Sequence, residues 1–202
     1  MKEITALILS VFVVFGCSES SSDILEASAT ENLAFDSVEV MDTTDEDLYY
    51  SQLGNYKIQF PDSVIQLTEV LDTPYGSLNT VTDLCTVGEQ KVYLVKSTEY
   101  PADLLLDQPV EFRKELLQNG IRETKLRHSI SDASIEMEMT LGEHMGYYYQ
   151  IADTNRGIAC WHILADNRLY QVLISALSAE LSQEEIDSFI KSFKVLGNEE
   201  QN

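Results

Sequence analysis

Histidine, serine and carboxylate side chains that stand close together are the residues in this chain suited to nucleophilic and general-base chemistry. The chain has three histidines, His128, His144 and His162. Serines follow His128 and Glu143 precedes His144, so a small hydrolase would use His128 or His144 with a nearby serine or carboxylate. The histidine spacing fits no zinc motif, and neither a G-x-S-x-G elbow nor a Walker loop is present. We therefore expect no catalytic residue, metal or cofactor, and keep the hydrolase as the alternative.

Cysteine 17 is placed for a different chemistry, the modification of its thiol after secretion. Lys2 opens the sequence, an apolar run extends from Ile4 to Phe15, and Gly16 stands directly before Cys17. A basic start, a short apolar stretch and a small residue at the cleavage point are typical of a secretory signal peptide. The apolar run is shorter than the roughly 20 residues needed to cross a bilayer. Residues 1–16 are therefore predicted to be a cleaved signal.

This segment resembles the signal of bacterial lipoproteins, whose cysteine is acylated and becomes the mature N-terminus. Gly16 and Cys17 match the lipobox of that family, and Val14 is an acceptable apolar substitute. Phe15 and Glu3 depart from the family pattern. The resemblance implies cleavage between Gly16 and Cys17 and attachment of Cys17 to a bilayer of the bacterial cell envelope, facing the periplasm or the surface. An ordinary cleaved signal or an uncleaved anchor are the alternatives.

The segment 17–54 that follows the signal is strongly acidic. Between Ser18 and Tyr50 there are ten Asp and Glu residues and no Lys or Arg, in a chain of formal net charge −21. A stretch with this charge and no apolar periodicity buries too little surface to offset its ordering entropy. We predict a disordered tether, with binding of cations or of a basic partner as the alternative. The acidity argues against nucleic acid, which is recognised through clustered basic residues.

Alternating and capped segments place the folded domain over 55–197, followed by an acidic tail over 198–202. Strands are predicted over 56–60, 77–87, 90–100, 134–141, 147–152, 157–165 and 168–175. Short links between the last four strands predict an antiparallel meander. A first helix is predicted from Asp107 to Gly120. Ser182 and Glu185 form a capping box that begins a closing helix. The fold class predicted is α+β, an antiparallel sheet flanked by at least two helices.

Two strands of the meander carry side chains of interest. In the strand 134–141, apolar residues beginning with Ile135 and Met137 alternate with Glu136 and Glu138, which predicts one buried and one wet face. The two carboxylates share a face, as a glycosidase pair would, but a wet sheet face explains them better. The run of tyrosines at 147–149 favours packing in a strand, with an aromatic binding surface as the alternative.

The order of these elements resembles that of the PsbP-like (Mog/PsbP-like) domain, found in photosystem accessory proteins and in bacterial secreted or lipid-anchored proteins. The resemblance runs from Asn55 to Gly197 and depends on the opening strand to Pro61, Glu99-Tyr100-Pro101, the helix up to Gly120, Arg168-Leu169-Tyr170 and Ser192-Phe193. It implies a PsbP-like sandwich and a non-catalytic binding or assembly role. Fold likeness by itself does not establish function.

Cys85 and Cys160 are the two cysteines that remain if Cys17 carries lipid. In an exported protein they are candidates for a disulfide. Two reduced thiols acting as small apolar core residues are the alternative, which we slightly prefer. The hypothesis from the sequence is thus a membrane-anchored envelope lipoprotein with a non-catalytic binding or accessory domain. Its partner, a protein or a small molecule, is not specified by the sequence.

Overall fold

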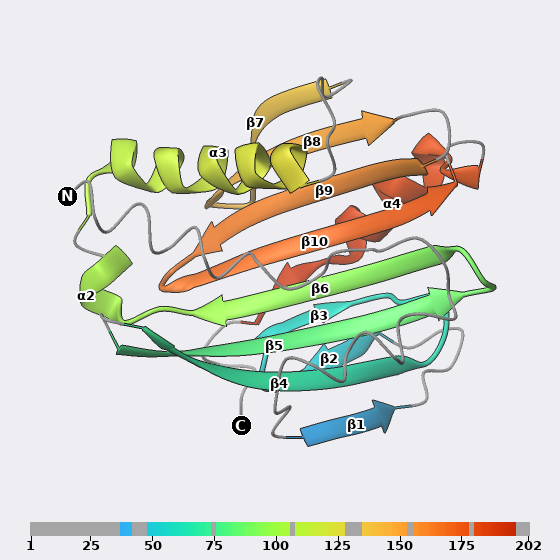
Figure 1. The fold of residues 1–202 in the computed structure, drawn as a ribbon, viewed down its shortest axis with the longest axis horizontal. Coiled ribbons are helices and arrows are strands. Elements are labelled where there is room, and N and C mark those ends of the chain that lie inside the picture. The colour runs from blue at the N-terminus through green and yellow to red at the C-terminus, as the bar shows by residue number, and fades with distance from the viewer. Residues whose placement is uncertain are drawn as a thin grey trace.

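An antiparallel sheet of eight strands organises the described part of the chain. The structure is a computed structural model that describes residues 37–41, 48–73, 76–105, 108–127, 135–152, 156–177 and 180–196. The strands of this large sheet are β1 (Ser37–Met41), β4 (Val64–Thr73), β5 (Gly76–Val87), β6 (Lys91–Glu99), β7 (Ile135–Leu141), β8 (His144–Ala152), β9 (Arg156–Ala165) and β10 (Arg168–Leu177). They lie in the order β1-β4-β5-β6-β10-β9-β8-β7, and all neighbours are antiparallel (Figure 1).

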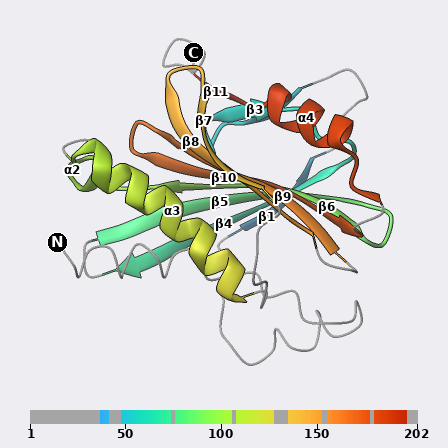
Figure 2. The same cartoon turned by 90° about the horizontal axis from the view of Figure 1, so that it is seen from above.

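A small sheet and three helices complete the described residues. The small sheet has the order β11-β3-β2, and its strands are β2 (Tyr49–Ser51), β3 (Tyr56–Ile58) and β11 (Lys194–Val195). The helices are α2 (Ala102–Leu105), α3 (Val110–Arg127) and α4 (Gln183–Ser192). Figure 2 shows α3 on one face of the large sheet, and α4 with the small sheet on the other. The large sheet is therefore the middle layer of three.

Strand β9 lies inside the large sheet, and both of its faces are buried from Gly157 onward. Trp161 and Ile163 belong to the apolar cluster that also contains Phe189 of α4. Leu164, which alternates with them, packs instead in the cluster that contains Leu117 of α3. The near-continuous apolar composition of β9 follows from this position, because each face needs its own apolar residues.

The predicted α+β class is wrong, because the fold is β-rich: strands account for 58% and helices for 22% of the described residues. The α+β sandwich implied by the PsbP-like resemblance is corrected with it. The difference comes mainly from strands that were not predicted from the sequence, above all β4, which pairs with β5 from Ile65 to Thr73. The four consecutive strands predicted as a meander are present, since β7, β8, β9 and β10 pair in chain order.

Helix α3 lies on the path of the chain from β6 to β7, which stand four strand-to-strand steps apart in the large sheet. Four steps correspond to about 19 Å, and a helix of 18 residues is about 27 Å long. The helix was predicted to end at Gly120, but it continues to Arg127. Its apolar side also continues, because Ile121 packs with Tyr149 and Ile151 of β8. This packing outweighs the low helix propensity of glycine.

The closing helix α4 begins as predicted. The Ser182 side chain accepts a hydrogen bond of 3.2 Å from the backbone N–H of Glu185, which is the interaction expected of an N-cap. Ile186 and Phe189 are buried against the large sheet. The capping box and the apolar stripe therefore locate this helix correctly.

The boundary predicted at Asn55 lies inside the folded part. Strand β2 (Tyr49–Ser51) pairs with β3, and β1 (Ser37–Met41) pairs with β4. Both strands belong to the segment 17–54, which was predicted to be a disordered tether. Tyr49 is only 4% exposed, so the acidic segment supplies a core residue. The rest of 17–47, the signal 1–16 and the tail 198–202 lie outside the described residues.

Candidate functional site

Several residues singled out from the sequence lie outside the described part of the chain. Gly16 and Cys17, the predicted cleavage and lipid-attachment residues, are among them, and so is His128. The helices that the structure does describe include none with the length and apolar character needed to span a bilayer.

The structure separates the two remaining cysteines. Cys85 on β5 and Cys160 on β9 are buried reduced thiols, and three strand-to-strand steps lie between their strands. Three steps amount to about 14 Å, whereas a disulfide needs Cα atoms within about 7 Å. Cys85 faces the α4 layer and Cys160 the α3 layer, so the disulfide considered from the sequence is not formed. Burial raises the pKa of Cys85 to about 11 and that of Cys160 to about 12.

The two described histidines do not form a hydrolytic centre. His144 begins β8 at the hairpin that joins it to β7, and in the described residues it makes no hydrogen bond to a serine or carboxylate. His162 is buried beneath α3, with its ring edge-on to Tyr149 at a centroid distance of 5.6 Å. Burial lowers the pKa of His162 to about 4, and a backbone hydrogen bond at Leu117 offsets part of the effect.

Of the tyrosines at 147–149, Tyr148 and Tyr149 are buried inside the fold and Tyr147 is partly buried. Tyr148 is 8% exposed and stacks on Trp161 at a centroid distance of 5.0 Å. Tyr149 is completely buried on the opposite face. The hydroxyl of Tyr147 accepts a hydrogen bond of 3.2 Å from Gln118 of α3. Packing, the interpretation favoured from the sequence, therefore accounts for these rings.

A buried carboxylate, Asp83 on β5, lies at the centre of a polar cluster between the two sheets. It is 0% exposed, and it accepts hydrogen bonds from the hydroxyls of Tyr49 and Tyr56 and from the amide of Gln66. The Tyr49 and Gln66 bonds are both 2.8 Å long. These donors come from β2, β3 and β4. A buried charge is tolerated only when it is hydrogen-bonded in this way, so the cluster ties the sheets together.

The electrostatics of this cluster make it a structural contact. Burial, together with the charge of Asp83 and the hydrogen bonds to it, raises the pKa of Tyr49 and of Tyr56 well above the usual value. Both hydroxyls therefore remain protonated at neutral pH and donate to Asp83. All three side chains are closed to solvent, which leaves no room for a substrate.

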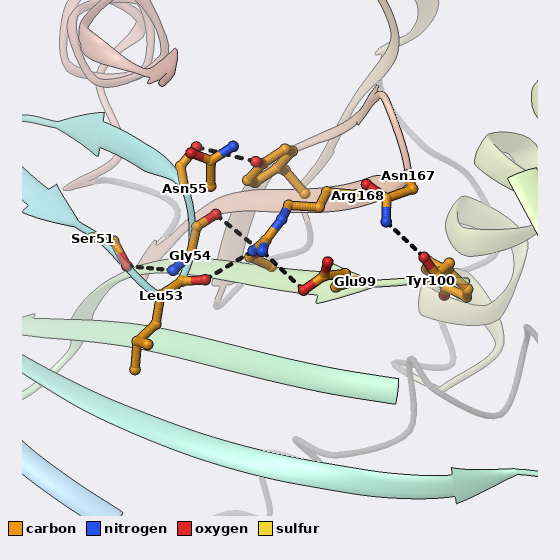
Figure 3. Close-up of polar contacts among 10 residues, drawn as sticks. Ser51, Leu53, Gly54, Asn55, Glu99, Tyr100, Asn167 and Arg168 are labelled. Carbon is orange, nitrogen blue, oxygen red and sulfur yellow. Dashed lines mark hydrogen bonds and ion pairs between the residues drawn. The ribbon is translucent and has the colours of Figure 1, made fainter. Parts of the chain in front are cut away.

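Arg168, the first residue of β10, fastens the turn between β2 and β3 to the large sheet (Figure 3). One guanidinium nitrogen donates to the carbonyl of Leu53 at 2.8 Å, and the other lies 2.9 Å from Oε2 of Glu99. The Ser97 hydroxyl donates to the carbonyl of Gly54 at 3.1 Å. Arginine suits this position because its planar fork reaches two acceptors at once.

A second charged contact joins α4 to β6. Lys91 lies 2.9 Å from both carboxylate oxygens of Glu185, and the Tyr93 hydroxyl donates to the same carboxylate. Burial would raise the pKa of Glu185, but the hydrogen bonds from Tyr93 and Lys91 lower it below the usual value. A groove of about 340 Å³ lies beside it, lined by Gln59, Phe60, Pro61, Tyr93, Glu185, Ser188 and Phe189. Glu185 is therefore ionised and accepts three hydrogen bonds. These features suit a residue that anchors α4 to β6 better than a general acid.

The outer strand β7 exposes the face that the sequence predicted to be buried. Ile135 is 44% and Met137 53% exposed, while Met139 is partly buried against the core. On the other face, Lys114 of α3 lies 3.0 Å from Oε2 of Glu138. A groove of about 490 Å³ lies there, lined by Lys114, Glu138, Met139, Thr140, Glu143, Met145, Gly146 and Tyr147. Neighbouring exposed apolar residues such as Ile135 and Met137 are typical of an interaction surface.

From the sequence, Asp83 had no assigned role, and Arg168 appeared only among the residues that carry the PsbP-like resemblance. Asp83 lies inside the strand predicted over 77–87, where aspartate is uncommon. This unusual placement was the one feature of the sequence that could have marked Asp83 as a residue with a specific partner. Its partners lie 17 to 34 positions away, which no local pattern relates. In the described ranges, no three His, Cys, Asp or Glu side chains lie close enough to hold a metal ion.

Comparison of the sequence with known proteins supplies no family for this chain. No protein-family description matches the chain, and no curated protein matches it either. The function must therefore be argued from the sequence signal and from the geometry of the exposed β7 strand.

Proposed function

We propose that this chain is a lipid-anchored protein of the bacterial cell envelope whose β-rich domain binds a partner and does not catalyse a reaction. The anchor is supported by the apolar run that ends in Gly16 and Cys17 and by the polar residues that follow. More than one acyl chain is needed for a firm attachment, and bacterial lipoproteins carry two or three.

The observation that carries the binding role is the exposure of Ile135 and Met137 on the outer strand β7. Large apolar side chains at 44% and 53% exposure leave apolar area in water that a partner would cover, at about 25 cal/mol per Å². Their alternation with Glu136 and Glu138 gives the strand two chemically different faces. The polar clusters at Asp83 and Glu185 are occupied by their own hydrogen bonds, so β7 is the better candidate.

The anchor is tested by replacing Cys17. In cells grown with labelled fatty acid, the wild-type chain should carry the label and fractionate with membranes. Cys17→Ala should accumulate as uncleaved precursor without label, whereas Ser18→Ala should behave as wild type. Label that persists in Cys17→Ala would refute the lipoprotein assignment.

The binding role is tested by a photo-cross-linking amino acid placed at Met137 in the anchored protein in cells. The matched control is Val70 on β4, which is also exposed, at 51%. We expect a discrete adduct from position 137, of a mass different from a dimer of the chain, and none from position 70. Absence of an adduct at 137, or equal adducts at both positions, would contradict the binding role of β7.

A further inference from the structure

The face of the large sheet that carries α3 is buried over a wider area than this helix can cover. Helix α3 lies over β8 and β9. A helix with its side chains is about 10–12 Å wide, which corresponds to about two strands of a sheet. Farther along the sheet, on β5 and β6, Thr82 is 6%, Leu94 8% and Lys96 8% exposed.

The strand register places these residues on the same face as α3. Lys96 of β6 stands opposite Thr82 of β5 and opposite Gln171 of β10, and Gln171 stands opposite His162 of β9. Residues directly opposite in neighbouring strands share a face, and His162 lies beneath α3. Leu94 lies two positions from Lys96 on β6 and therefore points to the same side.

Asn119 of α3 shows the same burial from the side of the helix. Ile121 packs against β8 through Tyr149. At 3.6 residues per turn, Asn119 is rotated about 160° away from Ile121, so it points toward β10, yet it is only 3% exposed. The described elements on this side of the sheet are α3 and the four-residue α2 (Figure 2). They leave the cover over β5 and β6 to be assigned.

The end points of the segments outside the described ranges limit which one can supply this cover. Residues 128–134 lead from α3 to β7, away from β5, and residues 42–47 lead from β1 to the small sheet on the other face. The tail 197–202 follows β11, which also belongs to the small sheet. The segment that ends at Asp36 is the longest, and it joins β1, which pairs with β4 next to β5.

The length of this segment is sufficient for the task. Residues 23–36, if extended, reach about 46 Å. The three strand-to-strand steps from β4 to β10 amount to about 14 Å. Fourteen residues can therefore cross β4, β5 and β6 in any path over this face.

The composition of residues 23–36 matches the chemistry of the face. Lysine is almost never buried without a paired group, and the cross-strand neighbours of Lys96, Thr82 and Gln171, are neutral. A carboxylate beside Lys96 must therefore come from the layer above the sheet. Leu84 and Leu94 stand opposite each other on this face and need apolar cover. The segment holds four carboxylates and four large apolar residues, namely Asp23, Glu26, Glu31 and Asp36 with Ile24, Leu25, Leu33 and Phe35.

We propose that residues 23–36 form a strap that packs across the α3 side of β4, β5 and β6, with carboxylates beside Lys96 and apolar side chains over Leu84 and Leu94. The strap is then part of the folded domain. In a chain anchored at Cys17, a consequence that rests on the proposed function, only residues 17–22 lie free between lipid and domain. Six extended residues reach at most about 22 Å, so the strap holds the domain close to the membrane.

The first test measures the reaction of position 82 with a thiol reagent. Thr82→Cys is compared in the full chain, purified in detergent micelles, and in the same chain without residues 23–36. Fragmentation in the mass spectrometer assigns the label to position 82, separately from the native cysteines. We expect labelling about tenfold or more faster without the strap, because a covered side chain reacts only through local opening. The matched control is Thr86→Cys, an exposed position on the same face of β5, which should react equally fast in both chains.

Charge neutralisation tests the pairing with Lys96 while keeping the length of the chain. In one variant the four strap carboxylates are replaced, by Asp23→Asn, Glu26→Gln, Glu31→Gln and Asp36→Asn. The matched control removes the same charge between β1 and β2, by Asp42→Asn, Asp45→Asn, Glu46→Gln and Asp47→Asn. Labelling of Thr82→Cys should become about threefold or more faster in the strap variant, as expected for the coupling of contacting groups, and stay unchanged in the control. Adding Lys96→Met should abolish the difference between the two sets, because the cation is then absent.

Equal labelling of position 82 with and without residues 23–36 would overturn the proposal, because the strap would then not cover this face. Equal effects of the two neutralised sets would overturn it as well, because net charge would explain them. If circular dichroism shows that the shortened chain does not fold, the neutralised variants decide. The labelling does not depend on the anchor: a covered position 82 in a chain whose Cys17 carries no lipid would keep the strap and refute the proposed anchoring alone.

Discussion

The hydroxyl of Tyr49 donates a hydrogen bond of 2.8 Å to Oδ1 of Asp83, although the two residues are 34 positions apart in the sequence. Tyr49 lies in the acidic N-terminal segment, and Asp83 lies in β5 of the large sheet. The bond therefore joins a segment without apolar periodicity to the interior of the fold. Loss of a donor to a buried carboxylate is costly, since the charge keeps its desolvation penalty.

Tyr49→Phe should lower the free energy of unfolding by about 1–3 kcal/mol, because it removes one donor to Asp83 while preserving the ring. The matched control is Tyr50→Phe, since Tyr50 is 54% exposed on the other face of the same strand. Urea unfolding followed by tryptophan fluorescence measures both, with Trp161 as the only reporter. Equal stability of the two variants would show that the Asp83 bond contributes nothing.

A chain that begins at Asn55 should be less stable than one that begins at Thr43, by roughly 3–5 kcal/mol. The shorter chain lacks β2, so it loses the burial of Tyr49, about 2 kcal/mol, and a donor to Asp83, about 1–3 kcal/mol. Thermal unfolding by calorimetry measures the difference. Coincident transitions of the two chains would mean that the folded unit does begin at Asn55.

Arg168→Lys should loosen the turn between β2 and β3 while the rest of the fold remains. Lysine keeps the charge, but it cannot reach the Leu53 carbonyl and the Glu99 carboxylate with a planar fork. We expect a loss of about 1 kcal/mol and faster amide hydrogen exchange at residues 52–55, with little change in α4. The control is Arg156→Lys, at an exposed position on β9. Equally fast exchange at residues 52–55 in this control variant would count against the Arg168 contact.

Protonation of His162 should make the fold less stable in mild acid. The unfolded histidine takes up a proton near pH 6.5, whereas burial lowers the pKa of the folded His162 to about 4. Between these values the unfolded state binds more protons, so stability rises with pH. The stability that the neutral, buried His162 contributes is fully present above pH 6.5, and it is lost progressively as the pH falls toward 4.

The measurement is urea unfolding at pH 5 and pH 7 for the wild type and for His162→Phe, which has no titrating group at this position. The wild type should lose about 2 kcal/mol more than the variant between the two pH values, from about 1.4 kcal/mol per pH unit. Carboxylates elsewhere titrate in both proteins and cancel in the comparison. Parallel losses would show that His162 is not buried in its neutral form.

Local pattern was enough to identify several elements. The strands predicted over 134–141 and 157–165 correspond to β7 and β9, and short links predicted that β7 to β10 pair in chain order. The Ser182 cap located α4 because capping involves residues only three positions apart. These features depend on neighbours in sequence, which a single sequence displays directly.

Only the tertiary structure decided what lies against each element. The pattern of β7 shows that Ile135 and Met137 share a face, but nothing local tells that this strand ends the sheet and leaves both residues exposed. Likewise, the sequence contains Cys85 and Cys160 but does not reveal that they face opposite layers. Side-chain period fixes which residues share a face, whereas cover and pairing are set by contacts between distant segments. Contacts between distant segments also bring Tyr49 beside Asp83 and pair β1 and β5 with β4, a strand that was not predicted from the sequence.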